Sequence, residues 1–313
     1  MEWGNSTTVT EFILLGLGQT PDVQLILLPL FLLFYAIVLP GNVLIIVTIR
    51  SDPQLDSPMY FFLANLAFLD ICYCFITPPK MLADLSSKNK AISYGGCMSQ
   101  LFFLHFLGAG EAFLLMAMAY DRYVAICRPL HYSVLVNKRI CCLLVAGAWT
   151  GGFIHGIILF ALIIQLPYCG PNVVDNFFCD VQQVVTLACM DTHKVKLLIF
   201  FNNGVVILMA FILLVISYTI LLIRLWIHSP KGRSKAASTC ISHIIVVFIM
   251  SCPAIYLYTL PLQTIPMEKM VAFFHTVIFP LMNPMIYTLR NKKIKNSMRN
   301  LVKRHLLFVG ESK

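Results

Sequence analysis

Charged residues are scarce in this sequence. Asp, Glu, Lys and Arg together make up 12% of its 313 residues, against about 25% in a typical soluble domain. So few charges cannot cover the surface of a soluble protein of this length. Intrinsic disorder is also excluded, because it goes with high charge and low hydrophobicity. Since hydrophobic residues amount to 59%, the composition indicates a protein that crosses a membrane several times.

The motifs of common enzymes are missing as well. The sequence contains no His-Glu-x-x-His, no Gly-x-Ser-x-Gly and no Gly-x-x-x-x-Gly-Lys-Ser/Thr. Four His residues lie in apolar stretches without the spacing of metal ligands: His105, His155, His243 and His275. We therefore expect no enzyme activity, no cofactor and, sodium apart, no metal ion.

Seven apolar stretches are long enough for transmembrane helices, which need about 20 residues each. They are continuous runs rather than the alternating pattern of barrel strands. We predict an all-α membrane protein: a seven-transmembrane helix bundle with a short amphipathic C-terminal helix. The predicted spans are residues 24–49, 58–85, 94–127, 139–166, 195–227, 236–262 and 270–289. They divide the chain into an N-terminal segment 1–23, a transmembrane domain 24–289 and a tail 290–313.

Lys and Arg are distributed unevenly between the two sides of this bundle. Residues 1–23 contain none, whereas the tail and the connections on its side contain 17 of the 23. Because cytoplasmic loops carry the excess of Lys and Arg, we expect an extracellular N-terminus and a cytoplasmic C-terminus at the plasma membrane. The net charge of +9 then reflects topology and contact with membrane lipid, and we expect no nucleic-acid partner. Asn5 begins an Asn-x-Ser/Thr sequon on the outer side, so we expect a glycan there.

The tail after Arg290 has the pattern of an amphipathic helix. Its apolar residues fall on one helical face: Ile294, Met298, Leu301 and Val302. Lys and Arg residues surround that face, which suits a helix lying on an anionic leaflet.

The predicted topology places four of the eleven cysteines outside: Cys97, Cys169, Cys179 and Cys189. Four oxidisable cysteines allow three pairings, and spacing alone leaves all three open. The other seven lie in spans or face the cytosol, where thiols stay reduced.

Two carboxyl groups lie deep in the predicted spans. Asp70 is about 18 Å, and Glu111 about 16 Å, from the cytoplasmic end of its helix, given a rise of 1.5 Å per residue. Asn42 and Asn283 lie nearby, at roughly 10–12 Å. One interpretation is a hydrogen-bonded layer with one or both acids protonated, and another is a sodium site formed by Asp70, Glu111 and Asn283. An ion- or proton-coupled transporter or channel would use the same acids and is the alternative function.

Several motifs follow one another along the whole chain. They are Gly41-Asn42, Pro58-Met59-Tyr60-Phe61-Phe62-Leu63, the run from Met118-Ala119-Tyr120-Asp121-Arg122-Tyr123 to Pro129-Leu130-His131-Tyr132, Phe177-Phe178-Cys179-Asp180, Ser217-Tyr218, Lys235-Ala236-Ala237-Ser238-Thr239-Cys240 and Asn283-Pro284-Met285-Ile286-Tyr287. This ordered set resembles vertebrate olfactory receptors, which are rhodopsin-like G-protein-coupled receptors. The resemblance implies an odorant receptor that activates a stimulatory (olfactory) heterotrimeric G protein and raises cAMP.

The resemblance also implies roles for particular residues. It pairs Cys97 with Cys179, which leaves Cys169 to pair with Cys189. It implies that an Asp121–Arg122 ion pair holds the helix end closed and opens to meet the G protein. The residues to which it assigns coupling or activation are Asp121, Arg122, Tyr123, Tyr218, His243, Asn283, Pro284 and Tyr287.

The residue types absent from two of the predicted spans limit the chemical class of the ligand. No Asp or Glu occurs between Tyr94 and Gly110, whereas receptors for cationic amines, which resemble this fold, place an acid there. No Lys occurs in residues 270–289, which excludes a retinal Schiff base. We expect a small neutral volatile ligand in the outer half of the bundle, with Gly108 leaving room for it. The candidate ligand-binding residues are Leu101, Leu104, His105, Gly108, Asn202, Asn203, Tyr258, Phe273 and Thr276.

Overall fold

A computed structural model describes residues 9–18, 20–87, 89–228 and 291–311, with short pieces between 241 and 282. Within these residues, five helical segments are long and apolar enough to cross a membrane. They are Asp22–Ser51, Pro58–Ser86, Tyr94–Cys127, Lys138–Ile164 and His193–Arg224. They confirm the first five predicted spans, while most of the predicted spans 236–262 and 270–289 lies outside the described residues.

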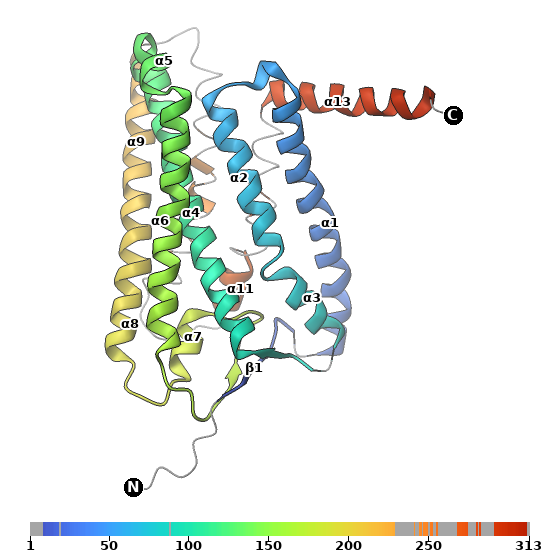
Figure 1. Ribbon diagram of the computed structural model, residues 1–313, viewed down its shortest axis with the longest axis vertical. Helices are drawn as coiled ribbons and strands as arrows, with labels where there is room; N and C mark the ends of the chain where they lie inside the picture. The colour runs from blue at the N-terminus through green and yellow to red at the C-terminus, as the bar shows by residue number, and fades with distance from the viewer. Residues whose placement is uncertain are drawn as a thin grey trace.

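The helices and strands are drawn in Figure 1. In chain order they are β1 (Glu11–Leu14), α1 (Pro21–Ser51), η1 (Pro53–Leu55), α2 (Pro58–Cys74), α3 (Pro78–Ser86), β2 (Ala91–Ser93), α4 (Tyr94–Cys127), η2 (Pro129–His131), α5 (Tyr132–Leu135), α6 (Lys138–Ile164), β3 (Val173–Val174), α7 (Val181–Thr186), α8 (His193–Ile199), the π-helix η3 (Phe200–Val205), α9 (Val206–His228), α11 (Glu268–Phe273) and α13 (Lys292–Glu311). The longest of them, α4, packs against α2, α6 and α9. It therefore carries side chains that face several parts of the bundle.

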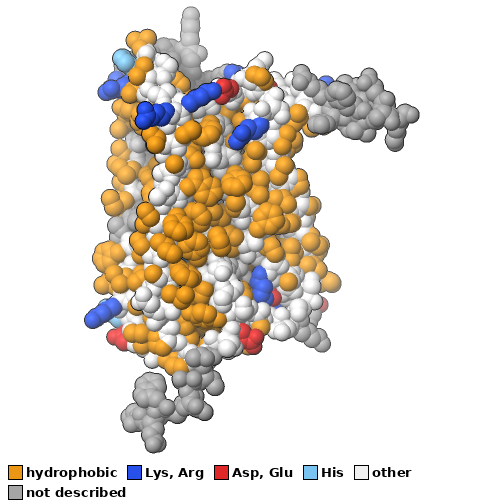
Figure 2. Space-filling view, viewed as in Figure 1, with side chains coloured by type: hydrophobic (Ala, Val, Ile, Leu, Met, Phe, Trp, Pro, Cys, Tyr) orange, Lys and Arg blue, Asp and Glu red, His pale blue; other side chains and the backbone are white. Residues whose placement is uncertain are grey.

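The surface agrees with a membrane-spanning bundle. Hydrophobic side chains cover the middle of the face shown in Figure 2, and Lys and Arg gather toward its two ends. Large apolar side chains on several helices are exposed, among them Leu25, Leu143 and Trp226. Soluble proteins rarely expose apolar patches of this extent, whereas a lipid-facing surface must be apolar.

A small sheet at one end of the bundle was not predicted. β1 pairs antiparallel with β2, with Phe12 opposite Ile92, and parallel with β3, with Ile13 opposite Val173. The side chains of Phe12 and Leu14 point inward and are fully buried in an apolar cluster with Leu101 and other residues of α4 and α6. We call this end of the bundle the sheet end and the opposite end, where α13 lies, the α13 end (Figure 1).

The second predicted span is broken near the sheet end. α2 ends at Cys74, two tight turns follow, and α3 begins with Pro78, which cannot donate a backbone hydrogen bond. The break leaves the carbonyl of Ile76 without a helical donor. Gln100 of α4 donates to it from Nε2 at 3.3 Å, so a side chain of the neighbouring helix stabilises the break.

The C-terminal amphipathic helix is present as α13. Ile294 is fully buried against the bundle, whereas Val302, on the same predicted face, is exposed. Tyr60 and Asn291 hydrogen-bond each other, and Ser297 donates to the Asp52 carboxylate. Only the first turns of α13 are therefore held by these contacts, and the helix extends sideways from the bundle (Figure 1).

Glycines bring α4 and α6 unusually close together. A Cβ atom added to Gly152 of α6 would lie 2.6 Å from the carbonyl oxygen of Phe106 and 2.8 Å from the nitrogen of Gly110. One turn later, a Cβ on Gly156 would lie 3.1 Å from the nitrogen of Phe106. Close backbone approach at small residues is a common way for helices to associate in membranes.

We expect Gly152→Ala to destabilise the protein by about 1–3 kcal/mol, because the new methyl group meets backbone atoms that cannot rotate away. The measurement is thermal unfolding of the purified protein in detergent. Gly147→Ala on the same helix is the matched control, since a Cβ there has no atom within 4 Å. Equal melting temperatures for the two variants would contradict the close packing.

Candidate functional site

At the α13 end, one carboxylate joins the end of α4 to α5. Asp121 is 1% exposed near the end of α4. Its Oδ2 accepts hydrogen bonds from Nε of Arg122 at 2.9 Å and from Nη2 of the same guanidinium. Its Oδ1 accepts a hydrogen bond from the hydroxyl of Tyr132, the first residue of α5, at 2.7 Å. Both oxygens of the carboxylate are therefore engaged, and the ion pair is closed.

Tyr132 was not among the predicted coupling residues, although it ends the quoted motif. Burial is the main cause that raises the pKa of its hydroxyl, and the Asp121 carboxylate raises it further. The hydroxyl consequently keeps its proton near neutral pH and remains a donor to Asp121. The sequence could not predict this hydrogen bond, because Tyr132 reaches Asp121 only after the connection that follows α4 folds back toward the helix.

The other predicted coupling residues are only partly described. Tyr218 of α9 is buried in an apolar cluster with Ala119 and Val247, and Tyr123 packs against that cluster. The structure therefore brings Tyr218 and Tyr123 together beside the end of α4. His243, Asn283, Pro284 and Tyr287 lie outside the described residues, so their roles stay predictions.

The predicted polar layer is buried. Asp70, Glu111 and Asn42 are all at most 2% exposed, and Asn42 donates from Nδ2 to the carbonyl of Val38 at 3.1 Å. Asn283, the third member of the proposed sodium site, lies outside the described residues. Within the described part of the chain, no three His, Cys, Asp or Glu residues form a metal-binding group. A sodium site that uses Asn oxygens therefore stays a prediction.

One face of the sheet-end part of α4 packs against α2. The hydroxyl of Tyr73 donates to the carbonyl of Leu104 at 3.1 Å, and a Cβ on Gly108 would lie 2.7 Å from that hydroxyl oxygen. The space beside Gly108, which we expected to admit a ligand, is thus filled by Tyr73. The assignment of Leu104 and Gly108 as ligand contacts stays a prediction.

A neighbouring face of α4 carries Leu101 and His105. Leu101 is fully buried beneath the sheet, and its carbonyl lies 2.9 Å from Nδ1 of His105. The imidazole of His105 lies opposite that of His155 in α6, with ring centroids 6.3 Å apart. In the sequence, His155 is only one of four His residues in apolar stretches, and its pairing with His105 is a finding of the structure.

The fifth span adds amide groups to this region. Asn202 and Asn203 lie in the π-helix η3. A π-helical turn holds one residue more than an α-helical turn, and this extra residue changes the direction of the side chains. Asn203 is fully buried and interacts with His155, yet its carboxamide makes no well-formed hydrogen bond with any described residue. The region thus offers neutral hydrogen-bonding groups, and such π-helical turns are frequent at functional sites. The predicted partners Tyr258 and Thr276 lie outside the described residues.

Phe273 lies apart from this group. Its ring contacts those of Phe31 in α1, at a centroid distance of 5.5 Å, and of Phe177 in the connection before α7, at 6.5 Å. In the same segment, Lys269 forms an ion pair with Asp175. α11 is therefore bound to the connection that covers the sheet end.

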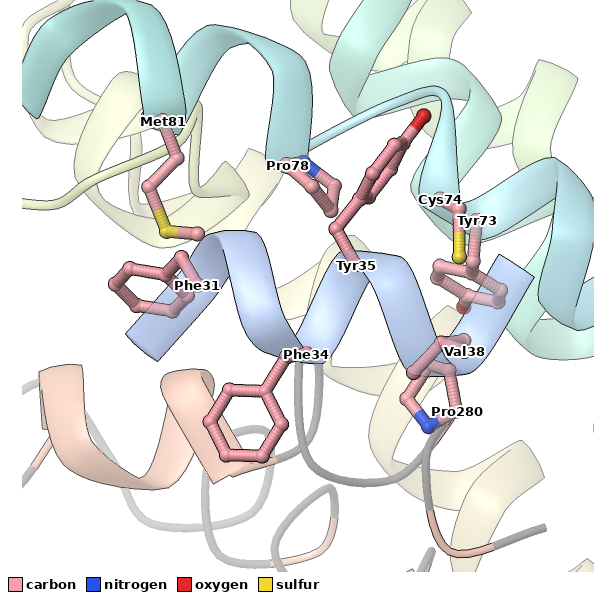
Figure 3. A pocket seen from close by; sticks show the side chains of 9 residues that line it. All are labelled: Phe31, Phe34, Tyr35, Val38, Tyr73, Cys74, Pro78, Met81 and Pro280. Carbon is pink, nitrogen blue, oxygen red and sulfur yellow. The ribbon is translucent and has the colours of Figure 1, made fainter. Parts of the chain in front are cut away.

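A crevice between α1, α2, α3 and the seventh span is shown in Figure 3. It is lined by Phe31, Phe34, Tyr35, Val38, Tyr73, Cys74, Pro78, Met81 and Pro280. Its cavity volume of about 20 Å³ admits little more than one water molecule. A volatile ligand would not fit there without a movement of the side chains.

Comparison with known proteins identifies the family. A family model described as "Olfactory receptor" matches residues 31–305. The chain is 58% identical to human "Olfactory receptor 4N5" over 306 residues, which are 98% of this chain and 99% of that relative. The chain belongs to the olfactory receptor family. Mouse "Olfactory receptor 4M1" is 57% identical over 308 residues, 98% of each chain.

Two disulfides hold the connection between α6 and α8 at the sheet end of this olfactory receptor. The structure joins Cys97 to Cys179 and Cys169 to Cys189, the pairs that the resemblance implied. Gln100, one turn after Cys97, accepts a hydrogen bond from the backbone N–H of Cys179 through Oε1 at 2.9 Å. The same side chain donates to Ile76, so it connects the loop to the break between α2 and α3.

The next residue of the loop is an acid with a shifted pKa. Asp180 is buried, and its side chain caps α7 by accepting the N–H of Gln182 at 3.0 Å. Burial raises the pKa of this carboxyl to about 6. Because the unfolded chain holds this proton less tightly, with a pKa of about 3.9, the stability contributed by Asp180 is complete below about pH 4 and is lost as the pH rises through 6.

We expect Asp180→Asn to raise the stability of the receptor at pH 7 by an amount on the order of 3 kcal/mol and to leave it unchanged at pH 4. The amide keeps the cap on α7 and carries no charge. Thermal unfolding at several pH values between 4 and 7 measures the effect. Asp191→Asn is the control, because Asp191 accepts the N–H of His193 in the same connection but is exposed. Parallel pH profiles for wild type and Asp180→Asn would contradict the burial of a charged form.

Proposed function

We propose that this olfactory receptor binds a small neutral volatile molecule within the sheet-end half of the bundle. Support comes from the neutral hydrogen-bonding groups on α4, α6 and η3, namely His105, His155 and Asn203, set among apolar side chains. A few polar groups in a mostly apolar site are the usual composition of a small-molecule site. The absence of Asp and Glu between Tyr94 and Gly110 argues against a cationic ligand.

We further propose that the α13 end faces the cytoplasm and couples to a stimulatory G protein of the olfactory type, which raises cAMP. The observation that carries this proposal is the closed arrangement of Arg122, Asp121 and Tyr132. It is a two-state element at the end of α4, because Arg122 can be released only when the Asp121 carboxylate gives it up. The excess of Lys and Arg in the tail and connections of that side supports the orientation. Asn5, the expected glycosylation site, would then be extracellular.

A transporter or channel that uses Asp70 and Glu111 is not favoured, because the compared relatives are named as receptors. Purified protein in liposomes distinguishes the two functions. Agonist-driven nucleotide exchange on an added G protein supports the receptor. Solute or ion flux in the absence of a G protein would overturn it.

We expect the two partners of Asp121 to have opposite effects on signalling. Tyr132→Phe removes one hydrogen bond from the closed state, and a loss of about 1 kcal/mol should raise basal cAMP roughly five-fold. Arg122→Ala removes the group proposed to meet the G protein and should abolish odour-driven cAMP. Both are measured in transfected cells together with surface staining.

Tyr120→Phe is the control for Tyr132→Phe, because Tyr120 is 39% exposed on α4 and belongs to none of the described hydrogen bonds. It should leave basal cAMP unchanged. Normal odour-driven cAMP in Arg122→Ala at wild-type surface level would rule out the coupling role.

The pocket is tested with an agonist found by screening volatile compounds. His105→Ala, Asn202→Ala and Tyr258→Phe should each shift the dose–response to concentrations several-fold higher, since one lost hydrogen bond costs about 1 kcal/mol. Phe103→Leu, at a lipid-exposed position of α4, should leave the potency unchanged. If all three variants keep the wild-type potency at equal surface level, the ligand binds elsewhere.

A further inference from the structure

A wide groove lies at the α13 end, far from the proposed pocket. Its volume is about 650 Å³. Ile46, Ile49 and Arg50 of α1 form one wall, and Phe61, Ala64 and Phe68 of α2 form another. The connection from Asp52 to Ser57 closes the end of the groove. Asn65 of α2 also lines the groove, and its amide donates to the carbonyl of Phe61 in its own helix. The other side chains along the helices are apolar apart from Arg50, which lies with Asp52 and Asp56 at the polar end, here called the mouth.

The open side of this groove faces lipid. Phe68 is 49% exposed, and its ring contacts Trp149 of α6 at a centroid distance of 5.9 Å. Exposed apolar side chains continue the surface on both sides, at Val47 of α1 and Leu143 of α6. Because the chain is a multi-pass membrane protein, the molecules that reach this groove come from the adjacent leaflet. An acyl chain matches its apolar length, and a head group matches its mouth.

The mouth carries one cation and one acid that remain available. Arg50 forms no ion pair with any described residue. Asp56 pairs with Lys138 at 3.4 Å, but both side chains are largely exposed, so the pair is weak and easily exchanged. Asp52, by contrast, already accepts hydrogen bonds from Gln54 and Ser297.

We propose that this groove binds one phospholipid with a phosphoethanolamine head group. The phosphate binds Arg50, the primary ammonium binds Asp56, and an acyl chain lies along Ala64 and Phe68. A guanidinium is a good phosphate ligand, and a primary ammonium donates hydrogen bonds to a carboxylate. A choline head group has no N–H to donate, and a phosphoglycerol head group would leave Asp56 beside a net negative charge.

The test is native mass spectrometry of the purified receptor after removal of co-purified lipid. Phosphatidylethanolamine, phosphatidylcholine and phosphatidylglycerol with identical acyl chains are added in titration. We expect one phosphatidylethanolamine to bind more tightly than either of the others. Arg50→Gln should weaken its affinity about ten-fold, the size expected for a lost hydrogen bond between charged groups.

Three further variants distinguish binding of the lipid head group from binding of the acyl chain. Asp56→Asn should remove the preference for phosphatidylethanolamine over phosphatidylcholine. Ala64→Phe should fill the groove and prevent binding of all three lipids. Arg139→Gln, an exposed cation at the same end of α6 that does not line the groove, should leave the affinity unchanged.

Melting temperatures establish that each variant is folded. If Ala64→Phe fails to fold, the affinity of Arg50→Gln alone decides whether the groove is the binding site. Equal affinity of the three lipids for wild type would overturn the head-group assignment. Wild-type affinity in Arg50→Gln, or in a folded Ala64→Phe, would overturn the site itself.

Discussion

A polar backbone group inside a membrane must find its partner within the protein, because lipid offers none. The break between α2 and α3 is subject to this constraint, and α4 meets it through Gln100, which donates to the freed carbonyl of Ile76. Tyr73, the next-to-last residue of α2, adds a second link by donating from its hydroxyl to the carbonyl of Leu104. Since Gln100 also accepts from Cys179, the position of the connection before α7 depends on the same side chain. The interrupted helix is therefore joined to α4 and to this connection at the sheet end of the bundle.

The two ends of α4 differ in how they can respond to a change. At the sheet end, the disulfide, Gln100 and the buried cluster hold the helix to its neighbours in several directions. At the α13 end, the Asp121 carboxylate pairs with Arg122 of α4 itself and joins the helix to α5 through Tyr132. Ala119 and Tyr123 pack there in the cluster with Tyr218 of α9. The hydrogen bonds and the ion pair of this end can exchange partners, whereas the disulfide at the sheet end is covalent. The proposed direction of signalling, from pocket to G protein, agrees with this difference.

Long-range features account for what the sequence could not predict. The spans were predicted because hydropathy over about 20 residues is a property of the sequence alone. β1 was missed because it has four residues and its partners, Ala91–Ser93 and Val173–Val174, are remote in the chain. η3 was missed because one extra residue in a turn leaves no mark on composition. The contact of Gly108 with Tyr73 could not be predicted, because Tyr73 belongs to another helix.

β1 is the central strand of its sheet, and this has a consequence for biosynthesis. The strand is made first, β2 follows about 80 residues later and β3 about 160 residues later, which at 5–20 residues per second is roughly 8–30 seconds for β3. Until β2 is made, the backbone of β1 has neither of its partners, and until β3 is made, one of its edges remains unpaired. Unpaired strand edges of this kind are prone to wrong association. Assembly of the sheet end is thus a late step of synthesis, because the sheet is complete only when its last strand, β3, has been made.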